Sequence, residues 1–341
     1  MYVYVFKLIG DTSPQYILIC ITLCVFMVKL PTKEFQELVP KLREKDFYKS
    51  SSQRKICWSE YNLSQIEDSV ESLMFIKEAV DSCGSIDLSG RVGKPLTNPK
   101  SLAKAILLCE FMGLPERHAQ GWLKILGSFL GIKEILDDWV IGEAYDRLEV
   151  LHILKQVFEN TKTSDGILSG DGTGIETSRK QNYESTKKSN AYMTSIVDSR
   201  EIVQAFDISG KQECQAMHEL IKDVKGDSLR LDAGFVDRKL VKLINKLKMT
   251  PYIFPKKNLI LNAKGNPGWT KMYLNLLDDV QEWLKEYHQR SHTESFHSSF
   301  KRKNNTLTKR NYTAQLSQIT ARIIIHNQRR TSYFNRLAQA N

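Results

Sequence analysis

The chain has 341 residues with ordinary apolar (41%) and charged (26%) fractions, so it can bury a sizeable core in one large or two medium domains. Its formal net charge of +10 and pI near 9.1 indicate a polyanionic partner, although a membrane surface or simple solubility would also explain the charge. The six cysteines form no CxxC pair and no histidine cluster accompanies them, which argues against a zinc site and suits reduced thiols in the cytoplasm.

The N-terminal segment Met1–Leu30 is unusually apolar, with an uninterrupted run over Tyr16–Val28. This run is shorter than the roughly 20 residues that a membrane-spanning helix needs. A signal peptide is the competing interpretation, but Lys7 is the only cation ahead of the run and no small-residue cleavage site follows. We expect a segment that is buried or covered by a partner, or an upstream extension from a misplaced start codon, and no membrane association.

Residues 33–160 have the pattern of a helical region. Apolar residues at helical spacing predict helices over Glu67–Val80 and Pro99–Met112. After a Gly-Leu-Pro turn, a further helix runs through Trp122 to Phe129, and the last covers Tyr145–Phe158. Helix, short glycine turn and helix resemble a helix-turn-helix, which would make this a candidate DNA-binding region. Two packed helices with no DNA role fit the pattern equally well.

A Ser/Gly/Asp-rich boundary at Thr161–Gly170 opens a second region, 165–335, with a different pattern. Strands are predicted at Ile167–Ile175, Ala191–Val197, Glu201–Ile208, Ser228–Leu231 and Pro251–Phe254. Helices are predicted at Glu213–Val224 and Asp237–Met249. Strands first, then alternating strands and helices, favour an α/β fold in which a mixed sheet is flanked by helices.

The segment Thr270–Asn341 contains no Pro or Gly, so a long helix is predicted there. Four of its residues would lie within roughly 60° of one another on one helix face. They are Tyr287, Arg290, Glu294 and Lys301. Phe296 and Phe300 fall on the opposite side, where they can be buried. A carboxylate that faces a metal, beside cations that face phosphate oxygens, is what DNA strand cleavage needs. A surface helix with i,i+4 charge pairs is the alternative.

Two aspartates stand out by their positions. Asp171 lies in the first predicted strand of the second region, and Asp232 ends a later strand. Strand ends are where α/β sheets present functional groups, so both are candidates for a site. An Asp-Gly turn at Asp171 and a helix cap at Asp232 are the structural alternatives.

Motifs around these residues occur in the order found in DDE transposases. DGTG at Asp171–Gly174 resembles the first-Asp motif of that family, and LDAGF at Leu231–Phe235 resembles the second. Y-x2-R-x3-E-x6-K over Tyr287–Lys301 resembles the signature of the last catalytic helix in the insertion-sequence-four group. PKKN at Pro255–Asn258 resembles the segment that follows the second Asp. The resemblance covers about residues 166–333, and the helical region fits the family only loosely.

The resemblance implies an RNase H-like catalytic domain that cleaves and joins DNA with two Mg²⁺ or Mn²⁺ ions. The catalytic and metal-binding residues would be Asp171, Asp232 and Glu294. The contacts to the DNA backbone would come from Tyr287, Arg290 and Lys301. Mg²⁺ prefers oxygen ligands and retains waters, so few carboxylates suffice. Two ions roughly 4 Å apart can activate a water and stabilise the leaving 3′ oxygen.

The function expected from the sequence is therefore that of a transposase, acting in the cytoplasm at the nucleoid. Its partners would be double-stranded DNA, at the terminal inverted repeats and the target, and a second copy of itself in a synaptic complex. The alternatives are a metal-dependent nuclease of the same fold without strand transfer and a catalytically silent or domesticated DNA-binding protein. A membrane-associated basic protein, which rests only on Met1–Leu30, is the most remote alternative.

Overall fold

The computed structural model describes most of the chain outside the apolar N-terminal segment. The described residues are 31–44, 47–48, 56–84, 97–177, 190–262 and 264–340. The predictions made for Met1–Leu30 therefore lie outside the described residues. Among the helices of the described ranges, none combines the length and the apolar character that crossing a bilayer requires.

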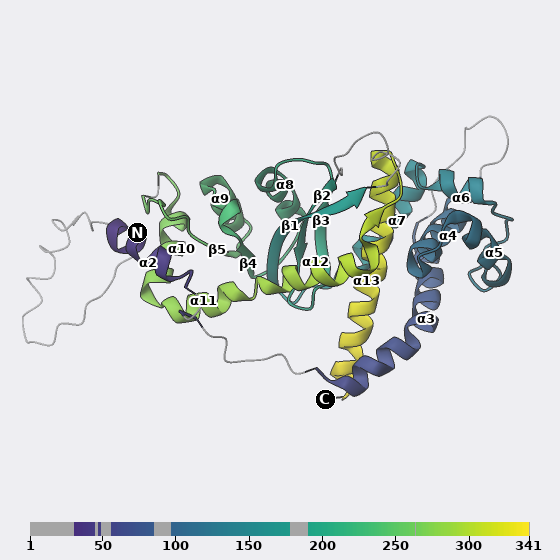
Figure 1. Ribbon diagram of the computed structural model, residues 1–341, viewed down its shortest axis with the longest axis horizontal. Coiled ribbons are helices and arrows are strands. Elements are labelled where there is room, and N and C mark those ends of the chain that lie inside the picture. Colours follow the sequence, from purple (N-terminus) through teal and green to yellow (C-terminus); the bar gives the residue numbers. More distant parts are fainter. Residues whose placement is uncertain are drawn as a thin grey trace, which may run out of the picture.

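A mixed sheet forms the centre of the molecule (Figure 1). Its strands in the described part of the chain are β1 (Ile167–Thr177), β2 (Asn190–Val197), β3 (Val203–Asp207), β4 (Ser228–Leu231), β5 (Thr250–Ile253) and β6 (Thr306–Leu307). The order is β3-β2-β1-β4-β5, and β6 pairs with the end of β1. β1, β2 and β3 are antiparallel, whereas β4 and β5 run parallel to β1. This arrangement confirms the predicted α/β fold and each predicted strand.

Helices cover both faces of this sheet (Figure 1). They are α8 (Glu213–Leu220), α9 (Arg238–Lys246), α10 (Pro267–Asp278), α11 (Val280–His288), α12 (Ser291–Asn304) and α13 (Tyr312–Ala340), with short 3₁₀ turns η3 (Ile221–Asp223) and η4 (Ala233–Phe235). Along β1, alternate residues face opposite sides. The side chain of Ser169 accepts a hydrogen bond from Thr293 of α12, whereas a side chain at Gly170 would point toward Met217 of α8. Helices α8 and α12 therefore lie on opposite faces of the sheet.

The helical region precedes the sheet, as predicted. It contains α2 (Thr32–Lys41), α3 (Trp58–Asp81), α4 (Pro99–Met112), α5 (Glu116–Leu126), α6 (Asp138–Ala144) and α7 (Leu148–Thr161). α4 has the predicted bounds and ends at Gly113, whose φ of 65° suits glycine. α2 lies at the other end of the molecule, where Phe35 contacts Tyr273 of α10 with ring centroids 5.3 Å apart (Figure 1).

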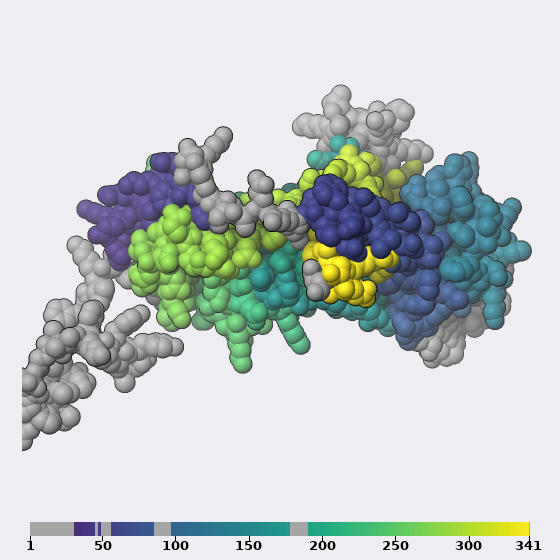
Figure 2. Space-filling model, turned by 90° about the horizontal axis from the view of Figure 1, so that it is seen from below, coloured from purple at the N-terminus to yellow at the C-terminus, as the bar shows by residue number. Residues whose placement is uncertain are grey.

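One apolar cluster joins the helical region to the sheet. It runs from Leu102 and Leu154 of the helical region to Ile175 of β1 and Phe296 of α12, all of them buried. The C-terminal helix α13 completes it by packing on α3, α4 and α7. Figure 2 shows the yellow end of α13 lying against the dark blue α3. The division at about residue 160 stays a prediction, because the two regions share this core.

The long helix predicted for Thr270–Asn341 is wrong, because this segment contains four helices and a short strand. Side chains that cap helices cause two of the breaks. Asp279 accepts a hydrogen bond from the backbone N–H of Glu282 (2.9 Å) and starts α11. Asn311 accepts one from the N–H of Ala314 (2.8 Å) and starts α13. Asp and Asn satisfy the free N–H groups of a helix end, so a segment without Pro or Gly can still be broken.

A buried guanidinium connects β4 to α11. The side chain of Arg230 is 1% exposed, and it forms an ion pair with Glu286 of α11. Its Nε donates to the Glu286 carbonyl (2.8 Å) and its Nη1 to Ser228 Oγ (2.7 Å). The carbon of the guanidinium lies 5.3 Å from the ring centre of Tyr252 on β5. Arg230 therefore joins three elements beneath the end of β4.

We expect Arg230→Met to lower the free energy of unfolding by about 3–5 kcal/mol, because it leaves the buried partners of this guanidinium unsatisfied. Urea unfolding followed by circular dichroism measures the loss. Lys285→Met is the matched control, since Lys285 pairs with Glu282 on the exposed side of α11, and its effect should stay within about 0.5 kcal/mol. An equal effect of both substitutions would contradict the role assigned to Arg230.

Candidate active site

The two aspartates singled out in the sequence lie side by side. β1 and β4 are parallel neighbours, and their register pairs Gly170 with Leu231. The next residue on each strand is Asp171 or Asp232, so the register brings both carboxylates to the same place. Asp171 Oδ1 accepts from its neighbour's N–H, that of Gly172 (2.9 Å). Asp232 Oδ1 accepts from the N–H of Ala233 (2.6 Å), which starts η4.

Helix α12 is fixed to the sheet by two buried polar contacts. Thr293 Oγ1 donates to Ser169 Oγ of β1 (2.7 Å). Ser195 Oγ of β2 and His297 Nε2 lie 2.9 Å apart. Phe296 is also buried, together with Phe300 one turn later, as the sequence predicted. These contacts orient α12 so that Glu294, next to Thr293, faces the aspartates.

Arg290 connects two of the three acids. Its Nη1 lies 3.0 Å from Oδ2 of Asp171, and its Nη2 pairs with Glu294. Burial raises the pKa of Asp171, and the charges of Asp232 and Glu294 raise it further, whereas the Gly172 N–H and Arg290 lower it. The carboxylates therefore repel one another, and within the described residues Arg290 is the cation that pairs with two of them.

The prediction that Tyr287, Arg290, Glu294 and Lys301 share one face of a single helix is wrong, because they are divided between two helices and the turn that joins them. α11 ends at His288 and α12 begins at Ser291, with the intervening turn closed by a hydrogen bond from the N–H of Arg290 to the Tyr287 carbonyl (2.9 Å). The Tyr287 ring is buried between Trp283 and Phe254, with ring centroids 5.4 and 5.1 Å away.

Burial raises the pKa of Tyr287 to about 12. Its hydroxyl interacts with Arg290, which lowers this pKa, so Tyr287 supports Arg290 from inside the protein. Lys301 lies on α12 seven residues after Glu294, about 10 Å along the helix axis. Lys301 is half-buried, with no ion pair to an acid within the described part of the chain. Of the four residues, Arg290 and Glu294 are in direct contact, and Lys301 lies apart from them.

The donor atoms of this site suit a hard divalent cation, because Asp171, Asp232 and Glu294 supply carboxylate oxygens. The three carboxylates are not gathered within 4.8 Å of one another; in the described residues, the group of His, Cys, Asp and Glu side chains that meets this limit is Cys214, His218 and Asp237. Mutual repulsion and the Arg290 bridge account for the wider spacing of the three acids. The site fits divalent ions if Arg290 gives up its carboxylate partners.

Within the Cys214, His218 and Asp237 group, the carboxylate has an ordinary structural role. Asp237 accepts hydrogen bonds from the N–H groups of Lys239 (3.0 Å) and Leu240 (3.3 Å), so it caps α9. The same carboxylate lies 2.7 Å from His218 Nε2, and together these contacts lower its pKa, against the opposing effect of burial. Asp237 is therefore the N-cap of α9.

A further acid escaped the sequence analysis. Glu213, the first residue of α8, faces the two aspartates from the other side of the sheet, and burial together with the charges of Asp171 and Asp232 raises its pKa. A glutamate at the start of a predicted helix is common, so nothing in the sequence separated this residue from a favourable first-turn acid. Only the fold brings it to the aspartates.

Comparison with known proteins identifies the part of the chain that carries this site. Residues 162–328 match the family model of the transposase DDE domain. This match supports an RNase H-like fold for the sheet and its helices, in agreement with the observed mixed α/β architecture. No curated protein and no solved structure matches the chain. The acids described above all lie within the matched range.

The histidine that fixes α12 should make stability depend on pH. Burial, together with the charges of Lys301 and Arg290, lowers the pKa of His297 from 6.5 to about 4. Between pH 6.5 and 4, His297 is protonated in the unfolded chain and neutral in the folded chain. The free energy of unfolding therefore decreases as pH falls through this range. This loss amounts to roughly 3 kcal/mol.

We expect His297→Gln, which keeps a hydrogen-bonding group near Ser195, to flatten the pH dependence of the unfolding free energy between pH 6.5 and 4. Urea unfolding at a series of pH values measures this slope. His326, buried with its pKa lowered to about 3, remains in the variant and contributes to the residual slope, as do the carboxyl groups whose pKa is raised. Identical slopes in the two proteins would contradict a neutral, buried His297.

Proposed function

We propose that this chain, whose residues 162–328 match the transposase DDE domain, is a transposase that cleaves and joins DNA at the ends of an insertion sequence in the group with the Y-R-E-K signature. The observation that carries the proposal is the meeting of three acids from distant parts of the chain. Asp171 and Asp232 end up adjacent on parallel strands, and Glu294 reaches Arg290 and the same site from α12. The parallel pairing of β1 with β4 and the packing of α12 on the sheet bring the acids together. A charge pair on the surface of a helix, which is the alternative interpretation of Arg290 and Glu294, would require neither of these contacts.

Asp171, Asp232 and Glu294 would hold two Mg²⁺ or Mn²⁺ ions. When bound, such ions neutralise the charge of the reacting phosphate and lower the pKa of a water or a 3′-hydroxyl that attacks it. The chain supplies the geometry: β1 and β4 fix the two aspartates relative to each other, and α12 fixes Glu294 on their open side.

Arg290 would change partners when DNA binds. Its guanidinium now neutralises Asp171 and Glu294. If the carboxylates held divalent ions, the Arg290 guanidinium would no longer be needed to neutralise them. Its planar N–H groups could then donate two hydrogen bonds to a phosphate. Tyr287, buried beside it, would hold the side chain in place during this exchange. Lys301, farther along α12, would contact the next part of the same backbone as a point charge.

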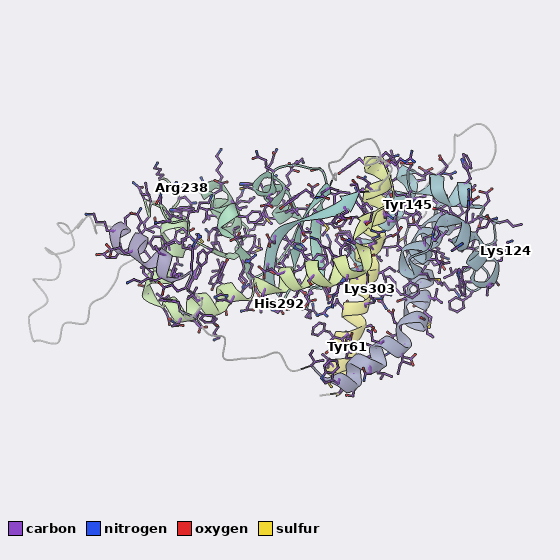
Figure 3. The ribbon with its side chains drawn as sticks, viewed as in Figure 1. Tyr61, Lys124, Tyr145, Arg238, His292 and Lys303 are labelled. Carbon is purple, nitrogen blue, oxygen red and sulfur yellow. The ribbon has the colours of Figure 1, made fainter. Side chains whose placement is uncertain are left out.

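A cationic groove extends this surface to the helical region. It has a volume of about 370 Å³ and lies where α3, α12 and α13 meet. Its basic residues are Arg302, Lys303, Arg322, Arg329 and Arg330. Arg322 is already paired with Glu110 of α4, and Arg329 with Asp68 of α3. Burial lowers the pKa of Lys303, nearby Arg329 lowers it further, and Asp68 raises it. Figure 3 labels Lys303 where α12 meets α13 and Tyr61 on α3 below it. We assign the DNA backbone to this groove.

We expect Asp232→Ala to reduce cleavage of a supercoiled plasmid that carries the element's ends by at least about a hundredfold, since a carboxylate that would hold a divalent ion at the reacting phosphate is lost. Agarose gels in the presence of Mg²⁺ measure nicking, linear product and joined product. Asp223→Asn is the matched control, because Asp223 is exposed on η3 away from the strand ends. Full activity of Asp232→Ala would refute the assignment. Binding without cleavage in any divalent ion, by the wild-type chain, would instead favour a catalytically silent DNA-binding protein.

The groove predicts which cations carry DNA affinity. We expect the double variant Arg302→Ala and Lys303→Ala to bind duplex DNA more weakly and to reduce the slope of log K against log salt by about 1 to 2, because two phosphate contacts are lost. Fluorescence anisotropy at several salt concentrations measures both quantities.

Its matched control removes one cation of the predicted helix-turn-helix and one that follows it in the chain. Lys124 lies on α5, at the far end of the helical region (Figure 3), and Lys133 is also exposed nearby. The double variant Lys124→Ala and Lys133→Ala should leave the salt slope unchanged. The opposite pattern, with binding lost only in this control, would place the DNA on α5 and contradict the groove.

A further inference from the structure

Three side chains with the chemistry of metal ligands meet where α8 contacts the start of α9. They are Cys214 and His218 of α8 and Asp237, the residue that caps α9. One sulfur, one ring nitrogen and one carboxylate oxygen, contributed by these three residues, all lie within 4.8 Å of one another. Within the described residues, this is the group of His, Cys, Asp and Glu side chains whose ligand atoms are close enough to share one ion.

Helix α8 brings two of these ligands to one face. Cys214 and His218 are four residues apart, so they lie one turn apart on the same side of the helix. Asp237 follows His218 by 19 residues, and its Oδ2 lies 2.7 Å from His218 Nε2. No short motif marks the group, because its third ligand comes from a different element. The spacing of the cysteines therefore argued against a zinc site, whereas the fold assembles the ligands of one.

The hydrogen bonds of Asp237 hold its carboxylate in position for a metal ion. Both oxygens accept from backbone N–H groups of α9, Oδ1 from Lys239 and Oδ2 from Leu240. Metal ligands in proteins are commonly oriented by outer hydrogen bonds of this kind. Capping explains the position of Asp237 and the contact that it makes with His218. It does not require a sulfur, yet the Cys214 sulfur lies beside both ligand atoms.

The donor atoms fit Zn²⁺ better than Mg²⁺. Zn²⁺ takes thiolate, imidazole and carboxylate ligands, whereas Mg²⁺ takes oxygen ligands. A thiolate and a carboxylate would balance the two charges of the ion, and a water would fill the fourth tetrahedral position. The side chains of His218 and Asp237 are 28% and 33% exposed, so the ion and its water can enter from solvent.

We propose that Cys214, His218 and Asp237 form a second metal site, which binds Zn²⁺ and ties α8 to the start of α9. Turn η4 lies between Asp232 and Asp237. An ion at this site would therefore fix the far end of the short segment that follows Asp232. The inference does not depend on the proposed function, because its ligands are separate from the three acids of the proposed active site.

The test uses Co²⁺ as a spectroscopic substitute for Zn²⁺ on the full, reduced chain. We expect the wild type to show the near-ultraviolet charge-transfer band of a thiolate bound to Co²⁺, and Zn²⁺ to remove this band by displacing Co²⁺. Cys214→Ser should abolish the band, and His218→Gln should weaken Zn²⁺ binding by at least about tenfold, because each removes a ligand. Cys57→Ser is the matched control, since Cys57 is equally half-buried but lies before α3, and it should keep the band.

Thermal unfolding separates a ligand from a residue that only supports the fold. In EDTA, Cys214→Ser should unfold near the wild-type temperature, whereas added Zn²⁺ should raise the unfolding temperature of the wild type and not of the variant. Asp171→Asn should keep the Co²⁺ band, because it removes none of the three ligands. A band that persists in Cys214→Ser, or that the wild type lacks, would overturn the zinc site and leave the proposed function intact. A wild type that shows the band but cleaves no DNA would support the zinc site and contradict the proposed function.

Discussion

The site depends on the compensation of like charges by one guanidinium. Asp171, Asp232 and Glu294 face one another in a partly buried place, where burial itself raises the pKa of Asp171. Arg290 holds Asp171 and Glu294 by ion pairs on either side of its planar fork. Because Arg290 neutralises two of the acids, the chain can fold with the carboxylates near one another in the absence of an ion. The carboxylate oxygens are then farther apart than the 4.8 Å expected of groups that share a metal ion. In the proposed function, the same guanidinium would give up its carboxylate partners to divalent ions and donate to a phosphate instead.

Much of the supporting structure serves to fix the two aspartates and α12. The parallel pairing of β1 with β4 aligns Asp171 with Asp232 without any side-chain contact between them. Below them, Arg230 ties β4 to α11 with an ion pair and hydrogen bonds in the core. Contacts to Ser169 and Ser195 then hold α12 on the sheet. Each contact lies within a few residues of an acid, so small shifts in packing would move the carboxylates.

The sequence predicted those parts of the fold that depend on local patterns. All five strands proposed for the second region formed, because short apolar runs between turn residues have few other conformations. The prediction of one long helix was wrong at Asp279 and Asn311, which cap α11 and α13. Their capping role was not evident from the sequence, because the polar residues around them also suit a helix. Tyr287 was expected on the DNA-facing side, yet it is buried, since the turn at Gln289 changes the direction of its face. Glu213 could not be found at all, because Asp171 and Asp232 are distant from it in the chain and become its neighbours only once the sheet is formed.

The helical region and the site are packed against the same apolar core, so the position of one depends on the position of the other. Phe296 and Phe300 of α12 pack in the apolar cluster that also contains Leu102 of α4 and Ile324 of α13. α13 in turn pairs with α3 through Arg329 and Asp68, with Nε and Oδ1 2.8 Å apart. A force on α3 or α13, such as DNA bound in the groove between them, is therefore carried through close-packed side chains to α12 and Glu294. In the proposed function, binding of the DNA backbone and positioning of Glu294 would in this way be coupled through the packed core.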